Sequence, residues 1–302
     1  MKVTALAGGV GGAKLLVGLA QTQMDLTAVV NTGDDCEIYG VHVSPDLDIV
    51  TYWLADIADR ERGWGVQGDT FNTVEALARL GEPTWFRLGD QDFATCLWRR
   101  TRLLEGVTLS AVTDGIRRSL GVGVRLLPMS DDPVRTHILT TDGRTLEFQE
   151  YFVKERQKPS VAGVGFRGLS GAKAAPEVLD SLRDADVVVV CPSNPVVSIG
   201  PILALPEVRD TLREHPRVVG VSPIIKGKPL KGPADRLMAA VGAEVSAAGV
   251  AEMYRDFIDV FVIDSLDEAE ASRIEALGIE LIVTDTVMTD QAASARLAEA
   301  IL

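Results

Sequence analysis

The stretch VTALAGGVGGAK, residues 3–14, decides how the rest of the chain is interpreted. Five apolar or β-branched residues precede four glycines in five positions, and an apolar stretch follows the lysine, which is typical of a buried strand, a glycine turn and a helix start. In such a first βα unit the free N–H groups at the helix N-terminus point toward a bound anion. We expect Lys14 to add a mobile positive charge there. The glycines that would let a phosphate approach the backbone are Gly8, Gly9, Gly11 and Gly12.

This glycine loop matches neither of the two well-known phosphate-binding patterns. A P-loop needs GxxxxGK followed by Ser or Thr, but Lys14 follows Ala13 and precedes Leu15, so no hydroxyl group is placed to hold magnesium. A dinucleotide fingerprint needs GxGxxG, and Lys14 stands where the third glycine belongs. A tight turn that needs glycine for geometry alone is therefore an open alternative.

Composition bounds the class of protein. A chain of 302 residues with 46% hydrophobic content can bury a full core, and no apolar run reaches the roughly 20 residues that a membrane span needs. The N-terminus leads straight into a strand without a basic region and a cleavage site, so we expect a cytoplasmic protein. A formal net charge of −13 argues against nucleic acid or an anionic membrane as the main partner. Three widely spaced cysteines without a CxxC motif indicate no zinc cluster.

Strand-like and helical segments alternate along most of the chain. This order predicts a doubly wound, Rossmann-like α/β fold with a mostly parallel sheet, in a single domain that spans residues 1–302. Residues of about 50–120 carry apolar side chains at helical spacing and predict a helical insertion, which holds all four tryptophans. Residues 136–153 surround an Asp-Gly turn and predict a β-hairpin, which we place at the edge of the sheet. The basic, glycine-rich residues 154–176 indicate a surface loop.

Four aspartates follow the second predicted strand on loops beside the glycine loop. Ligands bind in parallel sheets at the carboxyl ends of the strands, and hard oxygen ligands suit Mg²⁺, which bridges carboxylates to phosphates. We predict that Asp34, Asp35 and Asp46 are metal ligands. The alternative is that Asp34 and Asp35 shape a turn and that Asp46 or Asp48 caps the next helix.

Three further polar loops are candidate binding elements. Arg87 belongs to the segment RLGDQD inside the insertion, and Ser193 and Asn194 lie between prolines after the most apolar predicted strand. Lys226 opens a Gly/Pro-rich loop with two more lysines, which can balance a diphosphate on an acidic protein. No Ser-His-Asp set and no histidine base is evident. Together the loops fit a nucleotide diphosphate with Mg²⁺, and thus phosphoryl or phosphodiester transfer, which needs mainly positioning and charge neutralisation.

At these motifs the chain resembles, from end to end, the 2-phospho-L-lactate transferases of coenzyme F-420 biosynthesis. Seven segments stand in that family's order. They are GGVGGAK at Gly8, VVNTGDD at Val29, SPDLD at Ser44, RLGDQD at Arg87, PMSDDP at Pro128, PSNPVVSIGP at Pro192 and SPII at Ser222.

The resemblance implies a magnesium-dependent transfer by a homodimeric enzyme. The donor would be a guanosine diphosphate linked to lactate or to enolpyruvate, and the acceptor would be the terminal ribityl hydroxyl group of the deazaflavin Fo, with release of GMP. It also implies that Asp48 and Arg87 contact Fo, and that the glycine loop with Ser193 and Asn194 holds the guanosine diphosphate. We expect one aspartate, Asp46 or Asp48, to accept the hydroxyl proton.

Two other functions stay open at this point. The first βα unit also allows an NAD(P)-dependent dehydrogenase, although the missing third glycine weighs against it. A guanine-nucleotide-binding regulator without catalysis would need the same loops. The sequence selects neither the lactyl nor the enolpyruvyl donor, and it assigns no role to the loop at Ser130–Pro133.

Overall fold

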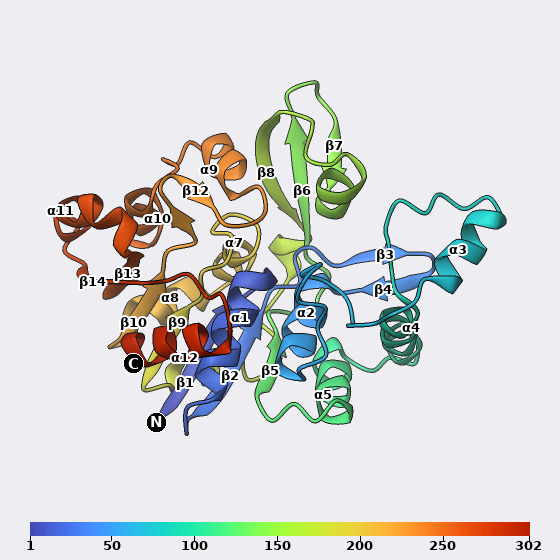
Figure 1. Ribbon diagram of the computed structural model, residues 1–302, viewed down its shortest axis with the longest axis horizontal. Helices are drawn as coiled ribbons and strands as arrows, with labels where there is room; N and C mark the ends of the chain where they lie inside the picture. The colour runs from blue at the N-terminus through green and yellow to red at the C-terminus, as the bar shows by residue number, and fades with distance from the viewer.

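The computed structural model describes all 302 residues and is built around a parallel seven-stranded sheet (Figure 1). The strand order is β14-β13-β10-β9-β1-β2-β5, and every neighbouring pair is parallel. The chain starts at β1, moves outward through β2 and β5, and returns to β9 beside β1 before it winds outward on the other side. The predicted doubly wound fold is therefore confirmed, with its topological switch point between β1 and β9. The strands are β1 (Lys2–Ala7), β2 (Asp25–Val30), β5 (Arg125–Pro128), β9 (Val187–Val190), β10 (Val218–Val221), β13 (Val260–Asp264) and β14 (Glu280–Thr284).

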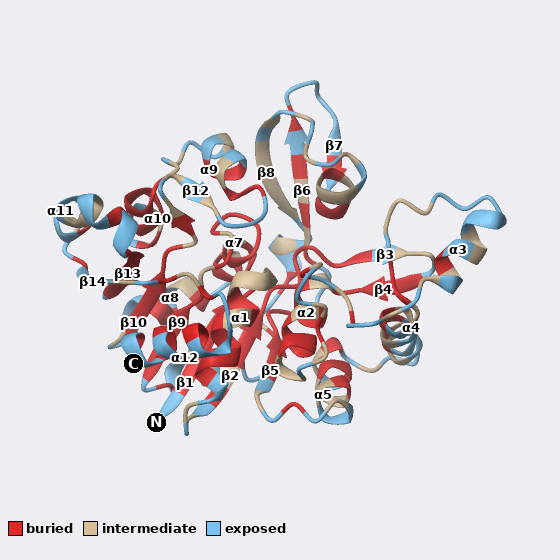
Figure 2. Cartoon of the chain, in the orientation of Figure 1, coloured by how far each residue is buried: buried red, intermediate tan, exposed pale blue.

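Both faces of this sheet are covered, which explains why its strands are almost wholly apolar. Side chains alternate along a strand, so Val188 and Val190 of β9 belong to one hydrophobic core while Val187 and Val189 belong to the other. Figure 2 shows the buried strands between the helical layers. The layer on one face contains α1 (Gly9–Ala20), α2 (Pro45–Leu54) and α12 (Gln291–Ile301). The layer on the other contains α6 (Val178–Arg183), α7 (Ile199–Ala204), α8 (Val208–Glu214) and α10 (Ala247–Tyr254).

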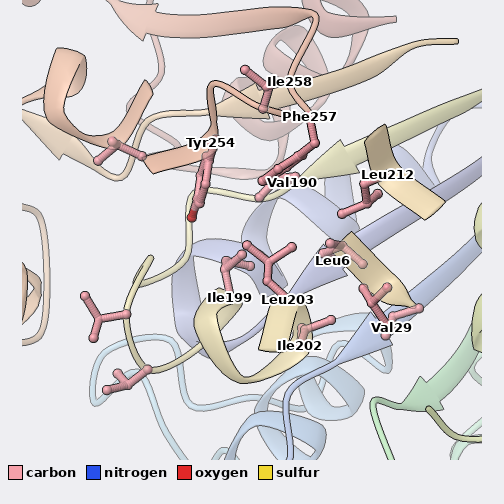
Figure 3. Close-up of a cluster of buried hydrophobic side chains, with 14 of the residues drawn as sticks. Leu6, Val29, Val190, Ile199, Ile202, Leu203, Leu212, Tyr254, Phe257 and Ile258 are labelled. Atoms are coloured by element: carbon pink, nitrogen blue, oxygen red, sulfur yellow. The ribbon is translucent and has the colours of Figure 1, made fainter. Parts of the chain in front are cut away.

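The core beside α7 and α8 holds the largest cluster of buried apolar side chains. Leu6, Val29 and Val190 point from the sheet toward Ile199 of α7 and Leu212 of α8 (Figure 3). Burying one such side chain stabilises the fold by roughly 1.5–3 kcal/mol. This packing also fixes the positions of the strand ends. None of the helices is both long enough and apolar enough to span a bilayer.

Residues 36–119, between β2 and β5, project to one side of the sheet (Figure 1). They begin with an antiparallel hairpin, which the sequence did not indicate, and continue with helices. A small apolar cluster of their own includes Val43, Val74, Leu88 and Cys96. The elements are β3 (Cys36–Ile38), β4 (Val41–Val43), α2, α3 (Asn72–Arg79), α4 (Asp90–Leu104) and α5 (Leu109–Ser119).

The predicted β-hairpin is present, but its place in the fold differs from the prediction. β6 (Arg135–Thr140) and β7 (Thr145–Glu147) pair around the Asp-Gly turn and form a separate antiparallel sheet with β8 (Val161–Arg167), in the order β7-β6-β8. The hairpin therefore does not lie at the edge of the main sheet, and residues 154–176 are not only a loop. Gly163 and Gly165 weaken the strand propensity of β8, and pairing with β6 supplies what propensity does not.

The remaining elements are short. They are a π-helical turn (Glu150–Lys154), two 3-10 turns (Leu169–Gly171 and Ser265–Glu270), the ribbon β11 (Ile224–Ile225) and β12 (Lys228–Pro229), α9 (Ala234–Ala240) and α11 (Ala271–Glu275).

Candidate functional site

A cleft of about 640 Å³ opens at the carboxyl ends of β1 and β9, at the topological switch point of the sheet. Loops of the main sheet form its floor, residues of the insertion form one wall, and residues beside the small sheet close the other. This is where ligands bind in open α/β sheets. The predicted site residues that line the cleft are Gly8, Gly9, Gly11, Lys14, Asp34, Asp46, Asp48, Arg87, Ser193 and Asn194.

The glycine loop is held to two other loops by short contacts. Ser193 accepts a hydrogen bond from the Gly8 N–H (3.1 Å) and donates one to the Gly8 carbonyl oxygen (2.7 Å), which ties the ends of β1 and β9 together. A Cβ atom at Gly8 would clash with Asp46, and one at Gly11 would clash with the Pro192 carbonyl oxygen. Close approach of the protein's own loops therefore requires glycine at both positions, which supports the geometric alternative for them.

The same loop still presents free donors to the cleft. Gly9 donates its N–H to Asp46 Oδ1 (2.7 Å), whereas the N–H groups of Val10 and Gly11, in the first turn of α1, have no acceptor in the protein. An anion bound there would satisfy them. Gly12 lies deeper, packed against Ser193 and Ala7, and does not line the cleft.

Asp34 and Asp46 form a buried pair of carboxylates on the cleft wall. The Asn31 side-chain amide donates to Asp46 Oδ2 (2.9 Å) and lies 3.4 Å from Asp34 Oδ1, and Gln149 donates to Asp34 Oδ2 (3.0 Å). Neither carboxylate has an arginine or lysine partner within ion-pair distance. Burial above all, and then the charges of Asp46 and Asp35, raise the pKa of Asp34, and burial raises the pKa of Asp46 to about 6. Two desolvated carboxylates that share only amide donors fit a hard divalent cation.

Asp35 does not line the cleft, unlike its neighbour Asp34. Its Oδ2 accepts a hydrogen bond from the Ser44 hydroxyl (2.9 Å) and contacts His42 Nε2 (3.0 Å), while His42 Nδ1 lies 2.9 Å from Glu37. Asp35 Oδ1 is buried without a partner. The predicted metal-ligand role of Asp35 thus has weaker geometric support than those of Asp34 and Asp46, because its side chain turns toward the β3–β4 hairpin.

Asp48 is engaged by an arginine that the sequence did not indicate. Arg99 of α4 is only 1% exposed and donates to both carboxylate oxygens of Asp48 and to the His42 carbonyl oxygen (3.0 Å). Ligand atoms of Asp48, Asp92 and Cys96 lie within 4.8 Å of one another, a spacing that also suits a metal. Because the guanidinium group already supplies the counter-charge, we interpret this cluster as an ion-pair network and not as a metal centre.

The aromatic wall of the cleft comes from two parts of the chain. Trp64 and Phe86 belong to the insertion, and Phe148 and Phe152 flank the small sheet. Of the four tryptophans in the insertion, only Trp64 lines the cleft.

Arginine side chains lie over aromatic rings at the rim. The Arg87 guanidinium lies 4.3 Å from the centre of the Phe71 ring and has no carboxylate partner, and Arg62 lies over both Trp64 and Phe71. Arg62 is also paired with Asp59 (2.7 Å), whereas the ring contact holds Arg87 in place without neutralising its charge. Arg87 is therefore exposed, charged and available to an anionic or polar ligand.

Two lysines approach the floor of the cleft, and Lys226 is not one of them. Lys14 donates to the Met288 carbonyl oxygen (2.7 Å), and burial and the charge of Lys231 lower the pKa of Lys14. Lys231 lines the cleft, whereas Lys226 is exposed and outside it, with its backbone N–H bound to Asp267 (2.8 Å). Within the lysine loop, the cleft position predicted for Lys226 is occupied by Lys231.

Asn194 and the Ser130–Pro133 loop have contrasting roles. Asn194 Oδ1 accepts from the Val196 N–H (3.0 Å) and shapes its own loop, which leaves the side-chain NH₂ group for a ligand.

The Ser130–Pro133 loop does not line the cleft. Ser130 donates to the Lys173 carbonyl oxygen (2.6 Å) and Asp131 accepts from the Ser110 N–H (2.7 Å), so these residues fasten neighbouring segments.

A family model described as 2-phospho-L-lactate transferase CofD matches residues 3–300. The chain belongs to this family. A 2-phospho-L-lactate transferase of Methanosarcina mazei is 43% identical over 298 residues, which cover 98% of each chain. A phosphoenolpyruvate transferase of Streptomyces griseus is 45% identical over 306 residues, covering 99% of this chain and 96% of the relative.

Solved structures agree on the fold of this transferase family. A UPF0052 family protein from Bacillus halodurans superimposes with a TM-score of 0.66 at 18% identity and covers 100% of this chain and 99% of its own. At this identity the likeness concerns the fold alone.

Several residues that lie in or behind the cleft wall of this CofD family member were not predicted from the sequence. Asn31 and Arg99 are the clearest, because one bridges two carboxylates and the other neutralises Asp48. Asn31 stands in VVNTGDD, directly after an apolar strand, and this position was a usable signal. Nothing in the amphipathic pattern of α4 marks Arg99 as buried. Gln149 and the loop at residues 286–289 lacked a local motif as well.

Proposed function

We propose that this protein transfers a phospholactyl or phosphoenolpyruvyl group from a guanosine diphosphate-linked donor to the terminal hydroxyl group of the deazaflavin Fo, with release of GMP. The carrying observation is the cleft at the switch point, which is lined by free N–H donors, by two lysines and by aromatic side chains. The names of the Methanosarcina mazei and Streptomyces griseus relatives support the two kinds of transferred group.

The N–H donors and lysines of the cleft would hold the donor. The free N–H groups of Val10 and Gly11 lie in the first turn of α1. Burial, and then the charge of Lys231, lower the pKa of Lys14. Two neighbouring ammonium groups repel one another, and a bound diphosphate relieves that repulsion. Asn194 adds an amide donor from the loop after β9, on the opposite side of the switch point.

Asp34 and Asp46 are the residues that would hold Mg²⁺. Asp35 lies next to Asp34 but does not line the cleft. The burial of Asp34 and Asp46, their raised pKa values and their amide-only donors fit a cation. Bound magnesium neutralises phosphate charge and so favours attack on phosphorus.

The aromatic side chains of the cleft would hold Fo, whose ring system is flat. Trp64, Phe86 and Phe152 offer apolar surface to such a ring, and Arg87 at the rim offers guanidinium donors. Asp48 lines the same wall with its charge balanced by Arg99. Catalysis would then rest on holding the acceptor hydroxyl group near the donor phosphorus and on balancing charge, which is the main requirement of phosphoryl transfer.

The test is release of GMP in reactions that contain the protein, Mg²⁺, Fo and donor, compared with reactions that lack one component. We expect GMP only in the complete mixture. Binding of guanosine nucleotide without GMP release would instead indicate a regulator. Tight binding of NAD(H), without a requirement for Mg²⁺, would indicate a dehydrogenase.

A further inference from the structure

The two aspartates of the RLGDQD segment have different environments. Asp90 accepts hydrogen bonds from Thr70, Asn72 and Thr73, and these contacts hold the start of α3. Asp90 does not line the cleft. Asp92 does line it, although its side chain is mostly buried, with 7% exposure.

Asp92 has one oxygen engaged and one free. Tyr52 of α2 donates its hydroxyl to Asp92 Oδ1 (2.8 Å), and no group of the protein donates to Oδ2, which lies beside Gly65 of the insertion wall. Oδ2 is not fully buried, and Asp92 lines the cleft, so this oxygen is accessible from the cleft. It is an unpaired acceptor on the wall that also carries Trp64.

No positively charged side chain is hydrogen-bonded to Asp92. Arg99 supplies one positive charge, and both of its donating nitrogens face Asp48. Burial first, and then the charges of Asp48 and Asp69, raise the pKa of Asp92 to about 7, whereas the Tyr52 hydrogen bond and Arg99 act in the opposite direction. Cys96 completes the titratable groups around it, and burial raises the thiol pKa well above its ordinary value.

The other aspartates of the cleft are less suited to accept a proton. Both oxygens of Asp48 bind Arg99. Asp46 Oδ1 accepts from the Gly9 N–H and Oδ2 from Asn31. Asp34 Oδ1 accepts from Asn31 and Oδ2 from Gln149. A general base needs a free oxygen within hydrogen-bond reach of the reacting group and a pKa near the working pH.

We propose that Asp92 is the residue that accepts the proton of the attacking hydroxyl group, and that Tyr52 and the Asp48–Arg99 pair position it. This inference rests on the proposed function. The acceptor oxygen forms a bond to the donor phosphorus while its proton passes to Asp92 Oδ2. The bond from that phosphorus to the bridging oxygen breaks, and GMP leaves with the electron pair. Asp92 then returns the proton to solvent.

The experiment compares Asp92→Asn and Tyr52→Phe with wild type in steady-state kinetics across pH 5–9. Asparagine keeps the Tyr52 hydrogen bond but accepts no proton. We expect kcat to fall on the order of 100-fold or more, with little change in the KM for Fo. The wild-type rate should rise with pH through a midpoint near 7 to a plateau at higher pH, because the base must be deprotonated, and this rise should disappear in Asp92→Asn.

Tyr52→Phe separates a chemical role from a structural one. The Tyr52 hydrogen bond lowers the Asp92 pKa, so its loss should shift the rise of the pH profile to higher pH. Asp92→Glu should have a higher kcat than Asp92→Asn, because it keeps a carboxylate. Asp180→Asn, on the exposed side of α6, is the matched control and should leave kcat and the rise unchanged.

Each outcome is informative. A wild-type rate and an unchanged rise with pH in Asp92→Asn overturn the assignment while the proposed function stands. A wild-type protein that makes no GMP from Fo and donor overturns the proposed function and this inference with it. A proportional loss of kcat in Asp92→Asn at every pH, with the rise retained, shows that Asp92 has only a structural role.

Discussion

Replacing Arg99 by methionine should destabilise the protein strongly. Arg99 is buried where α4 meets α2 and β4, and it donates to Asp48 and to the His42 carbonyl oxygen. Methionine retains an unbranched side chain but no charge and no donor. Asp48 then keeps its buried position without a counter-ion, beside Asp92.

The magnitude follows from removing one partner of a buried ion pair. Such a change costs about 3–5 kcal/mol, because the remaining charge is buried and unpaired. For a chain of this size we expect Tm to fall by roughly 10 °C. Arg99→Met/Asp48→Leu removes both charges and should lie within about 1 kcal/mol of wild type, since apolar replacement of a whole buried pair is often neutral.

The measurement is denaturant unfolding of wild type, both single variants and the double variant, monitored by circular dichroism at pH 8. Arg100→Met is the control, because Arg100 contacts Glu37 at the surface, where an ion pair contributes about 0–1 kcal/mol. Additive losses in the double variant, or a loss below about 1 kcal/mol for Arg99→Met, would refute the reasoning about this pair.

Three further predictions concern the floor of the cleft. Gly11→Ala should weaken donor binding at least tenfold, measured by calorimetry, because its Cβ meets the Pro192 carbonyl oxygen, whereas Gly123→Ala, with open space around it, should bind normally. Lys14→Ala should weaken donor binding and the exposed Lys228→Ala should not; equal affinities would return Lys14 to a purely structural role. The pKa of Asp46 is raised to about 6, so the folded protein holds a proton that the unfolded chain loses above its ordinary value of 3.8. Stability without metal should therefore fall as pH rises from about 4 to about 6. At pH 8, Mg²⁺ should raise the Tm of wild type but not of Asp46→Asn, and an equal rise in both would exclude Asp46 as a ligand.

The main sheet was predictable because its strands are short, apolar and separated by helical patterns. Runs such as Val187–Val190 have one interpretation in an alternating chain, and topology rules then bring their carboxyl ends to one edge. β8 was missed because glycine at two of its positions lowers strand propensity, and only pairing with β6 reveals it. The hairpin was recognised from its turn, but a turn says nothing about which sheet its strands join.

The candidate site was predictable at the level of loops and less so at the level of side chains. Gly8, Asp46 and Ser193 come together because each follows or faces the end of a central strand. The partner of Asp48 was not predictable, because Arg99 lies 51 residues away on a helix whose packing depends on the whole insertion. The direction of Asp35 depends on the β3–β4 hairpin, which the sequence did not indicate.

The most direct test of the proposed function is the mass of the deazaflavin product. Fo is incubated with the protein and Mg²⁺, separately with the lactyl and the enolpyruvyl guanosine diphosphate donor, and the products are identified by mass spectrometry. We predict that Fo gains one phospholactyl or one phosphoenolpyruvyl group with one of the donors, and that GMP appears in equal amount. Unmodified Fo with both donors, from protein that binds both ligands, would contradict the proposal.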